Sequence, residues 1–170
     1  FFFQAEDGIR DYKVDWSSDV CSSDLMGNGF PVGACWARTE VAAVFQPGDH
    51  GSTYSGTAVA GAAVNAVITE MKRLDAPRLA RTKGDHLAAA LAKVDGVRAV
   101  RGQGLLRAAD LGERDAKAVY LAALERGLVT NAVNANSLRL APPLTVSIDE
   151  IDEAVSIIAS VLADGIGVAS

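Results

Sequence analysis

The chain has 170 residues, of which 49% are hydrophobic and 22% charged, a size and apolar content that suit one domain or parts of two. The formal net charge of −5, without a basic patch, argues against nucleic acid as the main partner. No apolar run approaches the roughly 18 residues of a membrane span. Cys21 and Cys35 provide neither a disulfide framework nor zinc spacing, so we expect a protein of the reducing cytoplasm.

Residues 1–25 differ in composition from everything after Met26. They hold six acidic and two basic side chains, a charge of −4, and residues 26–170 carry the remaining −1. This segment has no sustained helix or strand period. Its stretches QAEDGIRD and SSDVCSSDL resemble translated sequencing-adaptor readthrough, and a disordered acidic tail is the alternative. We therefore expect an artefactual or disordered leader, which takes no part in the fold prediction.

The segment 26–76 predicts a few elements that cannot bury their own apolar surface. These are a buried strand at 32–37, one or two helical turns at 40–45, a loop at 47–56 and a helix of small residues at 57–74. Ser55 or Thr57 is the expected N-cap of that helix. The segment is typical of the remaining part of a larger α/β domain.

From Pro77 onward the pattern predicts a compact α+β unit. Helices are expected at 77–94, 114–126 and 148–162, and strands at 97–101, 105–111, 128–133 and 137–140. Pro77 suits a first helical turn, Gly127 a C-cap, and Ser147 with Glu150 a capping box. The apolar face expected for the helix 114–126 is formed by Val119, Leu121, Ala122 and Leu124. The order α-β-β-α-β-β-α predicts a small sheet with its helices on one face.

The loop Pro47–Gly56, PGDHGSTYSG, stands at the mouth of the predicted small-residue helix. Free backbone N–H groups and the positive end of the helix dipole favour an anion there, and phosphate is the commonest biological one. Ser52 and Thr53 are hydroxyl donors that could contact phosphate oxygens. The alternative is an ordinary capped turn.

Arg139 is the second residue of interest, because it is a cation between Leu138 and Leu140 on a predicted core strand. A buried guanidinium needs a partner, and a carboxylate matches its fork geometry. The alternative is an edge-strand arginine that faces water. His50 and His86, the only two histidines, have no further ligands at metal spacing, so we expect no metal site.

Four ordered stretches resemble class III pyridoxal-phosphate aminotransferases. They are Gly27–Ala34 (GNGFPVGA), Phe45–Gly56 (FQPGDHGSTYSG), Arg101–Leu106 (RGQGLL) and Glu125–Val146 (ERGLVTNAVNANSLRLAPPLTV). Within this family the closest likeness is to the acetylornithine aminotransferases. The resemblance runs from Met26 to about Leu162 and covers only the last third to two-fifths of such an enzyme.

The resemblance implies a fragment of the type I PLP-dependent aminotransferase fold, α/β followed by α+β. Residues 26–76 would be the end of the large cofactor domain with its linking helix, and residues 77–170 the small C-terminal domain. Thr53 would contact the phosphate of pyridoxal 5'-phosphate across the interface of a homodimer. Ser52 would lie near the substrate, and Arg139 would hold or position the substrate carboxylate.

This sequence also departs from the family pattern. Ser55, Thr57 and Ala58 replace the usual glycine, asparagine and proline after the GST loop. The lysine that joins the cofactor covalently in the family stands three residues before the position of Gly27, and here that position is Asp24. We therefore expect no catalytic residue in this chain, and an inactive fragment.

The family implies amino-group transfer between N-acetylornithine and 2-oxoglutarate, as in arginine biosynthesis. Ornithine, succinylornithine and 4-aminobutyrate are alternative amino donors, and their transaminases belong to the same class. A different alternative is a stand-alone, non-catalytic module that binds an amino acid without cofactor. The partners expected are small amino acids and 2-oxo acids, and neither nucleic acid nor a membrane.

Overall fold

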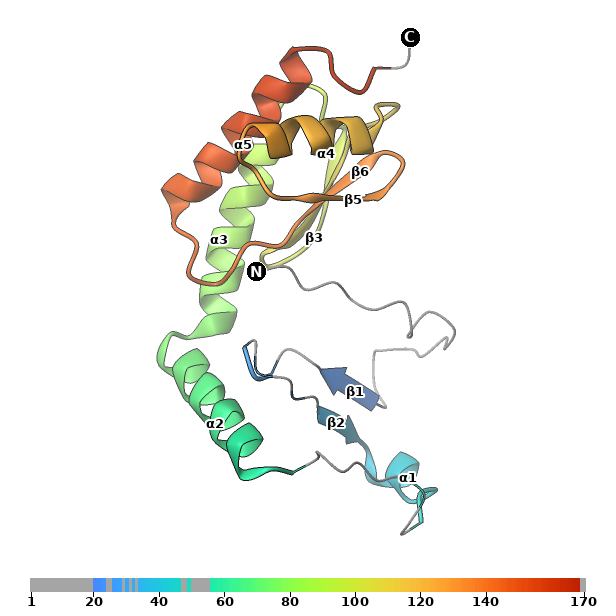
Figure 1. Ribbon diagram of the computed structural model, residues 1–170, viewed down its shortest axis with the longest axis vertical. Coiled ribbons are helices and arrows are strands. Elements are labelled where there is room, and N and C mark those ends of the chain that lie inside the picture. Colours follow the sequence, from blue (N-terminus) through green and yellow to red (C-terminus); the bar gives the residue numbers. More distant parts are fainter. Residues whose placement is uncertain are drawn as a thin grey trace. The chain divides into compact units, whose positions relative to one another are not determined.

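The structure, a computed structural model, describes residues 20–23, 26–28, 30, 32, 34–46, 49 and 56–168. The chain divides into two compact units, Phe1–Lys72 and Arg73–Ser170, each of which is described by itself. Figure 1 colours the chain from blue at the N-terminus to red at the C-terminus. The division lies four residues before the domain boundary expected at Pro77.

The described part of the first unit contains a two-stranded antiparallel ladder. β1 (Val20–Ser23) pairs with β2 (Ala34–Ala37), and Cys21 lies opposite Trp36. β2 confirms the strand predicted at 32–37. β1 was not predicted, because the segment before Met26 shows no strand period in its sequence. A single helical turn, α1 (Thr39–Ala42), follows.

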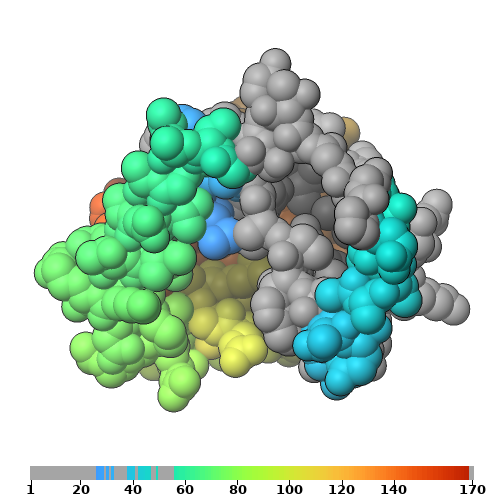
Figure 2. Space-filling view, turned by 90° about the horizontal axis from the view of Figure 1, so that it is seen from below, coloured from blue at the N-terminus to red at the C-terminus, as the bar shows by residue number. Residues whose placement is uncertain are grey.

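The long helix α2 (Ala58–Arg73) confirms the helix predicted at 57–74. Thr57 is its N-cap, since its Oγ1 accepts a hydrogen bond of 3.3 Å from the Ala60 N–H. Figure 2 shows the side chains of α2, in green, at the surface, and Val59 is 62% exposed. Met71 is 43% exposed, so α2 leaves apolar side chains uncovered in this chain, as expected for 26–76.

The second unit is built on a four-stranded antiparallel sheet. Its strands are β3 (Ala99–Gln103), β4 (Leu106–Asp110), β5 (Asn131–Asn134) and β6 (Ser137–Leu140). Their order across the sheet is β3-β4-β6-β5, with a register shift in β5 between Ala132 and Asn134. The two inner strands are therefore β4 and β6.

Three helices cover one face of this sheet: α3 (Ala76–Leu91), α4 (Ala116–Glu125) and α5 (Ile148–Ala163) (Figure 1). Ala109 and Leu138, neighbours on β4 and β6, are fully buried beneath them. The core also contains the helical side chains Leu87, Leu91, Val119, Ile151, Ile158 and Leu162. The predicted order α-β-β-α-β-β-α and the one-sided helical layer are confirmed.

The helix ends follow the predicted signals. Pro77 lies in the first turn of α3. Ser147 and Glu150 form the capping box of α5, with Ser147 Oγ 3.1 Å from the Glu150 N–H and Glu150 Oε2 2.7 Å from the Ser147 N–H. Gly127, just beyond α4, has the left-handed φ of 86° that a glycine C-cap adopts.

The buried face of α4 differs from the prediction. The sequence pattern selects Val119, Leu121, Ala122 and Leu124 as its apolar face, but Leu121 is 47% and Leu124 41% exposed. The small residues Ala116 and Ala123 are buried with Val119 instead. Their spacing of three and four residues fits one helical face, and small side chains let the helix approach the sheet closely.

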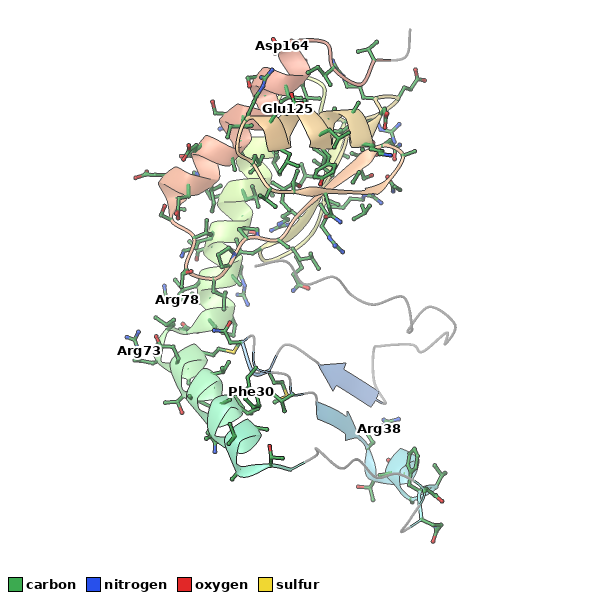
Figure 3. The ribbon with its side chains drawn as sticks, viewed as in Figure 1. Phe30, Arg38, Arg73, Arg78, Glu125 and Asp164 are labelled. Carbon is green, nitrogen blue, oxygen red and sulfur yellow. The ribbon has the colours of Figure 1, made fainter. Side chains whose placement is uncertain are left out.

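An ion pair links the ends of two helices in the second unit. Arg126, just after α4, donates to Ser160 Oγ and pairs with Asp164 at the end of α5, which is labelled in Figure 3. The carboxyl ends of α4 and α5 are thereby joined.

Among the residues that the structure describes, no helix has the length and apolar character of a membrane span.

Candidate functional site

Of the glycine loop Pro47–Gly56, the structure describes only Asp49 and Gly56. Ser52, Thr53 and His50 lie outside the described residues, and so does Asp24. At the start of the loop, Asp49 Oδ2 accepts a hydrogen bond of 2.7 Å from the Gln46 N–H. At its end, Gly56 has a φ of 68° and leads into the Thr57 cap of α2. The chain therefore turns at Asp49 and again at Gly56.

Arg139 lies on the face of the sheet opposite the helices. Its strand neighbours Leu138 and Leu140 are buried in the core, and side chains alternate along a strand, so Arg139 projects to the other side. β6 is an inner strand between β4 and β5. The alternative of an edge-strand arginine is therefore wrong, because the edges of this sheet are β3 and β5.

A polar row crosses the sheet at Arg139. Arg101 lies opposite Ala108, Ala108 opposite Arg139, and Arg139 opposite Asn131, so one residue from each strand belongs to the row. Directly opposed residues in antiparallel strands project to the same face. The small Ala108 lies between the two arginines in this row.

The Arg139 side chain is half-buried and held by its strand neighbours. Its Nε donates a hydrogen bond of 3.1 Å to Asn131 Oδ1. The hydroxyl of the buried Thr130 donates to the Arg139 backbone oxygen at 2.6 Å. Within the described part of the chain, the two terminal nitrogens of Arg139 make no hydrogen bond or ion pair. The expected carboxylate partner is thus not supplied by these residues.

A second group of charged side chains lies beside this row. Arg101 Nη2 donates to the buried Ser137 Oγ at 3.2 Å, and Ser137 lies opposite Asp110. The Gly112 N–H and the Arg98 guanidinium both bond to the Asp110 carboxylate, at 2.9 and 2.8 Å. These bonds, the one from Gly112 first, lower the pKa of Asp110 below its ordinary value.

His86 does not belong to this site. It is half-buried on α3, and its Nε2 lies 2.6 Å from Asp152 Oδ1 on α5, on the helical side of the sheet. This contact links the helices α3 and α5. No cluster of three or more metal-ligating side chains occurs among the described residues.

Two open depressions on the second unit lie around the amino end of α4 and the β5–β6 turn. One, of about 800 Å³, is lined by Arg114, Asp115 and Asn136, among others. The other, of about 540 Å³, borders Lys117, Tyr120 and Asn131. Arg139 lines neither. Its neighbourhood is an open sheet surface, which alone would not enclose a small molecule.

The sequence of this chain matches a known protein family over most of its length. The model of that family, described as "Aminotransferase class-III", matches residues 12–162. The chain belongs to the class-III aminotransferase family. The match begins within the segment 1–25, before the composition change at Met26.

Relatives of this class-III chain are longer than it is. It is 42% identical to the acetylornithine aminotransferase of Corynebacterium efficiens over 96% of its own length and 39% of the relative's. It is 40% identical to the acetylornithine aminotransferase of Caldanaerobacter subterraneus, over 82% of this chain and 36% of the relative. The chain therefore spans about two-fifths of these relatives.

Solved aminotransferases share the fold. The acetylornithine aminotransferase of Elizabethkingia anophelis superposes with a TM-score of 0.74 at 26% identity, covering 86% of this chain and 41% of that one. The ornithine aminotransferase of Toxoplasma gondii, described with partial occupancy of PLP at its active site, gives 0.73 at 26% identity, covering 85% and 36%. The expected fragment of the PLP-dependent aminotransferase fold is confirmed.

Sequence reasoning did not select Thr130 or Asn131, although both hold Arg139. Both lie in the stretch Glu125–Val146 that resembles the family, but nothing in that stretch marks them as partners of Arg139, which they contact across nine and eight residues of the chain. Only the register of β5 against β6 brings them together. A prediction of that register from the Asn134–Asn136 turn would have been the one available signal.

Proposed function

We propose that this chain is part of an enzyme that transfers an amino group between N-acetylornithine and 2-oxoglutarate. The observation that carries the proposal is that the two terminal nitrogens of Arg139 have no partner among the described residues, on a chain 42% identical to an acetylornithine aminotransferase. Both substrates carry a carboxylate, and a guanidinium fork binds a carboxylate through two parallel hydrogen bonds. Both relatives that match at 40–42% identity are acetylornithine aminotransferases, which favours the acetylated donor.

Arg139 is proposed to hold the substrate carboxylate. The half-buried position lowers the competition from water, so a charge-assisted pair is stronger there than at a fully exposed site. The hydrogen bonds from Arg139 Nε to Asn131 and from Thr130 to the backbone fix where the guanidinium stands. A fixed guanidinium orients the substrate, and orientation is a large part of catalysis.

Ser52 and Thr53 are proposed to serve the cofactor side of the site. Thr53 would donate to the phosphate of pyridoxal 5'-phosphate in a neighbouring subunit of a homodimer, and Ser52 would lie near the substrate. Short hydroxyl side chains in a glycine loop before a helix suit a phosphate group. The cofactor, when bound, supplies an electron sink for bond breaking at the amino-bearing carbon.

The chain offers no covalent anchor for that cofactor at the position where the family has one. Asp24 stands there, and a carboxylate cannot form the carbon–nitrogen double bond that a lysine amine forms with an aldehyde. No covalent step is therefore assigned to these residues. The chain by itself is proposed to be inactive, with its role limited to binding and orientation.

A chimeric enzyme tests the amino donor. The Corynebacterium efficiens relative would supply everything upstream of the segment that corresponds to Met26–Ser170, and this chain would supply the rest. Glutamate formation from 2-oxoglutarate is then measured with N-acetylornithine, ornithine, succinylornithine and 4-aminobutyrate as donors. We expect the highest kcat/KM with N-acetylornithine. A higher value with another donor would assign the chain to that branch of the family.

The alternative of a stand-alone amino-acid-binding module is tested with the same protein. The family match extends over both units of this chain, which favours a part of a larger enzyme. A chimera that folds but transfers no amino group from any of the four donors, while residues 73–170 alone bind an amino acid saturably, would support the module instead.

A further inference from the structure

The contact between Asn131 and Arg139 decides which edge of the guanidinium is open to a ligand. A guanidinium can form a paired contact through Nε and one terminal nitrogen, or through both terminal nitrogens. Asn131 Oδ1 accepts from Nε at 3.1 Å, so the Nε edge is occupied. The edge formed by the two terminal nitrogens stays open among the described residues.

The acceptor on Asn131 is neutral, which preserves the cation for a ligand. An aspartate in the same place would pair with the guanidinium, offset its charge and compete with an incoming carboxylate. An amide oxygen fixes the plane of the group without that competition. Asn131, directly opposite Arg139, therefore orients the guanidinium and leaves its positive charge available to a ligand.

The neighbouring Arg101 shows the contrast. It belongs to the same cross-strand row, but its Nη2 already donates to Ser137 at 3.2 Å. Its charge also lies close enough to Asp110 to lower the pKa of that carboxyl group. Arg101 thus donates from a terminal nitrogen to the protein, whereas the described residues contact the Arg139 guanidinium at Nε alone.

We propose that Asn131 is a positioning residue that directs Arg139 to bind the substrate carboxylate end-on, through its two terminal nitrogens. The inference rests on the proposed function, because it assumes that Arg139 holds a carboxylate. Beyond the proposed function, the inference names Asn131 as the residue that orients the guanidinium. It also names the edge of the two terminal nitrogens as the one that binds the ligand. Thr130 supports this arrangement by fixing the backbone of Arg139.

The test uses the full 170-residue chain labelled with ¹⁵N, with sodium glutarate as the probe and sodium chloride at matched ionic strength as the blank. Nuclear magnetic resonance follows the side-chain Nε–H signal of Arg139, assigned by its loss in Arg139→Ala. Variants Asn131→Ala and Asn131→Asp are compared with the wild type. Asn65→Ala, on the exposed surface of α2, is the matched control.

We expect glutarate affinity to fall by about threefold to tenfold in Asn131→Ala, because the fork is no longer oriented, and further in Asn131→Asp. Hydrogen exchange of the Arg139 Nε–H should accelerate in Asn131→Ala and stay slow in Asn131→Asp, which keeps the acceptor. Asn65→Ala should match the wild type in both measurements. If Asn131 only stabilised the fold, the hydrogen exchange of the Arg139 Nε–H and the affinity for glutarate would change together in both variants.

Two contrary results have different meanings. If the wild type binds glutarate through Arg139 and Asn131→Ala binds it equally well, the positioning role of Asn131 is refuted and the proposed function stands. If glutarate leaves the Arg139 signals of the wild type unchanged, the carboxylate-binding role of Arg139 is refuted, and the inference fails with it. Because Asn131→Asp is nearly isosteric, it keeps the test decisive should Asn131→Ala unfold.

Discussion

Gly84 on α3 lies directly against Gly104 in the β3–β4 turn. A Cβ added to Gly84 would stand 1.8 Å from the Gly104 carbonyl oxygen, a distance that no folded chain tolerates without movement. Gly104 itself has a left-handed φ of 54°. The helix therefore meets the hairpin through two residues without side chains, and this close contact helps to place the sheet that carries Arg139.

Replacing Gly84 by alanine should destabilise the second unit. The added methyl group meets backbone rather than a flexible side chain, so we expect a loss of about 1–3 kcal/mol in the free energy of unfolding. Urea unfolding followed by circular dichroism measures it. Gly61→Ala on α2 is the control, since a Cβ there meets nothing within 4 Å and should be neutral or stabilising. Equal stability of the two variants would contradict the close contact.

The capping box of α5 gives a second stability prediction. Ser147→Ala removes the acceptor for the Glu150 N–H and should cost about 0.5–2 kcal/mol in the free energy of unfolding. Ser156→Ala, on the exposed side of the same helix, should change stability little. Thermal unfolding of both variants compares them. A Ser147→Ala protein as stable as Ser156→Ala would show that the cap is not formed.

The Asp110 carboxylate predicts a pH dependence. Its pKa in the folded chain is lowered by the Gly112 N–H and by Arg98, so the folded state favours the ionised form. The stabilisation is complete above the ordinary aspartate pKa of about 4 and is lost as pH falls through the lowered folded value. Urea midpoints measured from pH 6 to pH 3 should fall less steeply in Asp110→Asn. Parallel curves would refute the role of Asp110.

Most helices and strands of the second unit could be predicted because their signals are local. Pro77, the Ser147–Glu150 pair and Gly127 each mark a helix end through contacts within a few residues. The failures have long-range causes. The exposure of Leu121 on α4 depends on which face of the helix meets the sheet, and hydrophobic spacing alone wrongly placed Leu121 on that face.

The candidate site was predictable only in part, for the same reason. Arg139 stood out because a cation between two leucines conflicts with a buried strand. Its partner Asn131 is defined by strand register, which local sequence does not fix. β1 was missed because Val20–Ser23 is short, and its pairing with β2 supplies order that its own residues do not signal.

The absence of a lysine at position 24 predicts how the chain responds to cofactor. Mixed with pyridoxal 5'-phosphate and reduced with borohydride, the chain should give only weak, scattered lysine labelling by mass spectrometry, because no amine stands at the family's covalent position. Asp24→Lys in the full 170-residue chain is the matched gain-of-function variant. Stoichiometric labelling of one lysine in the unaltered chain, accompanied by turnover, would contradict this prediction.

Binding of the substrate carboxylate by Arg139 is tested most directly by the kcat/KM of the chimeric transaminase with and without the Arg139 guanidinium. Arg139→Ala should lower kcat/KM for N-acetylornithine by about a hundredfold or more, because the oriented carboxylate contact is lost. Arg81→Ala, an exposed arginine on α3, should leave it unchanged. If the Arg139→Ala and Arg81→Ala chimeras work equally well, this sheet face does not hold the substrate and the account is wrong.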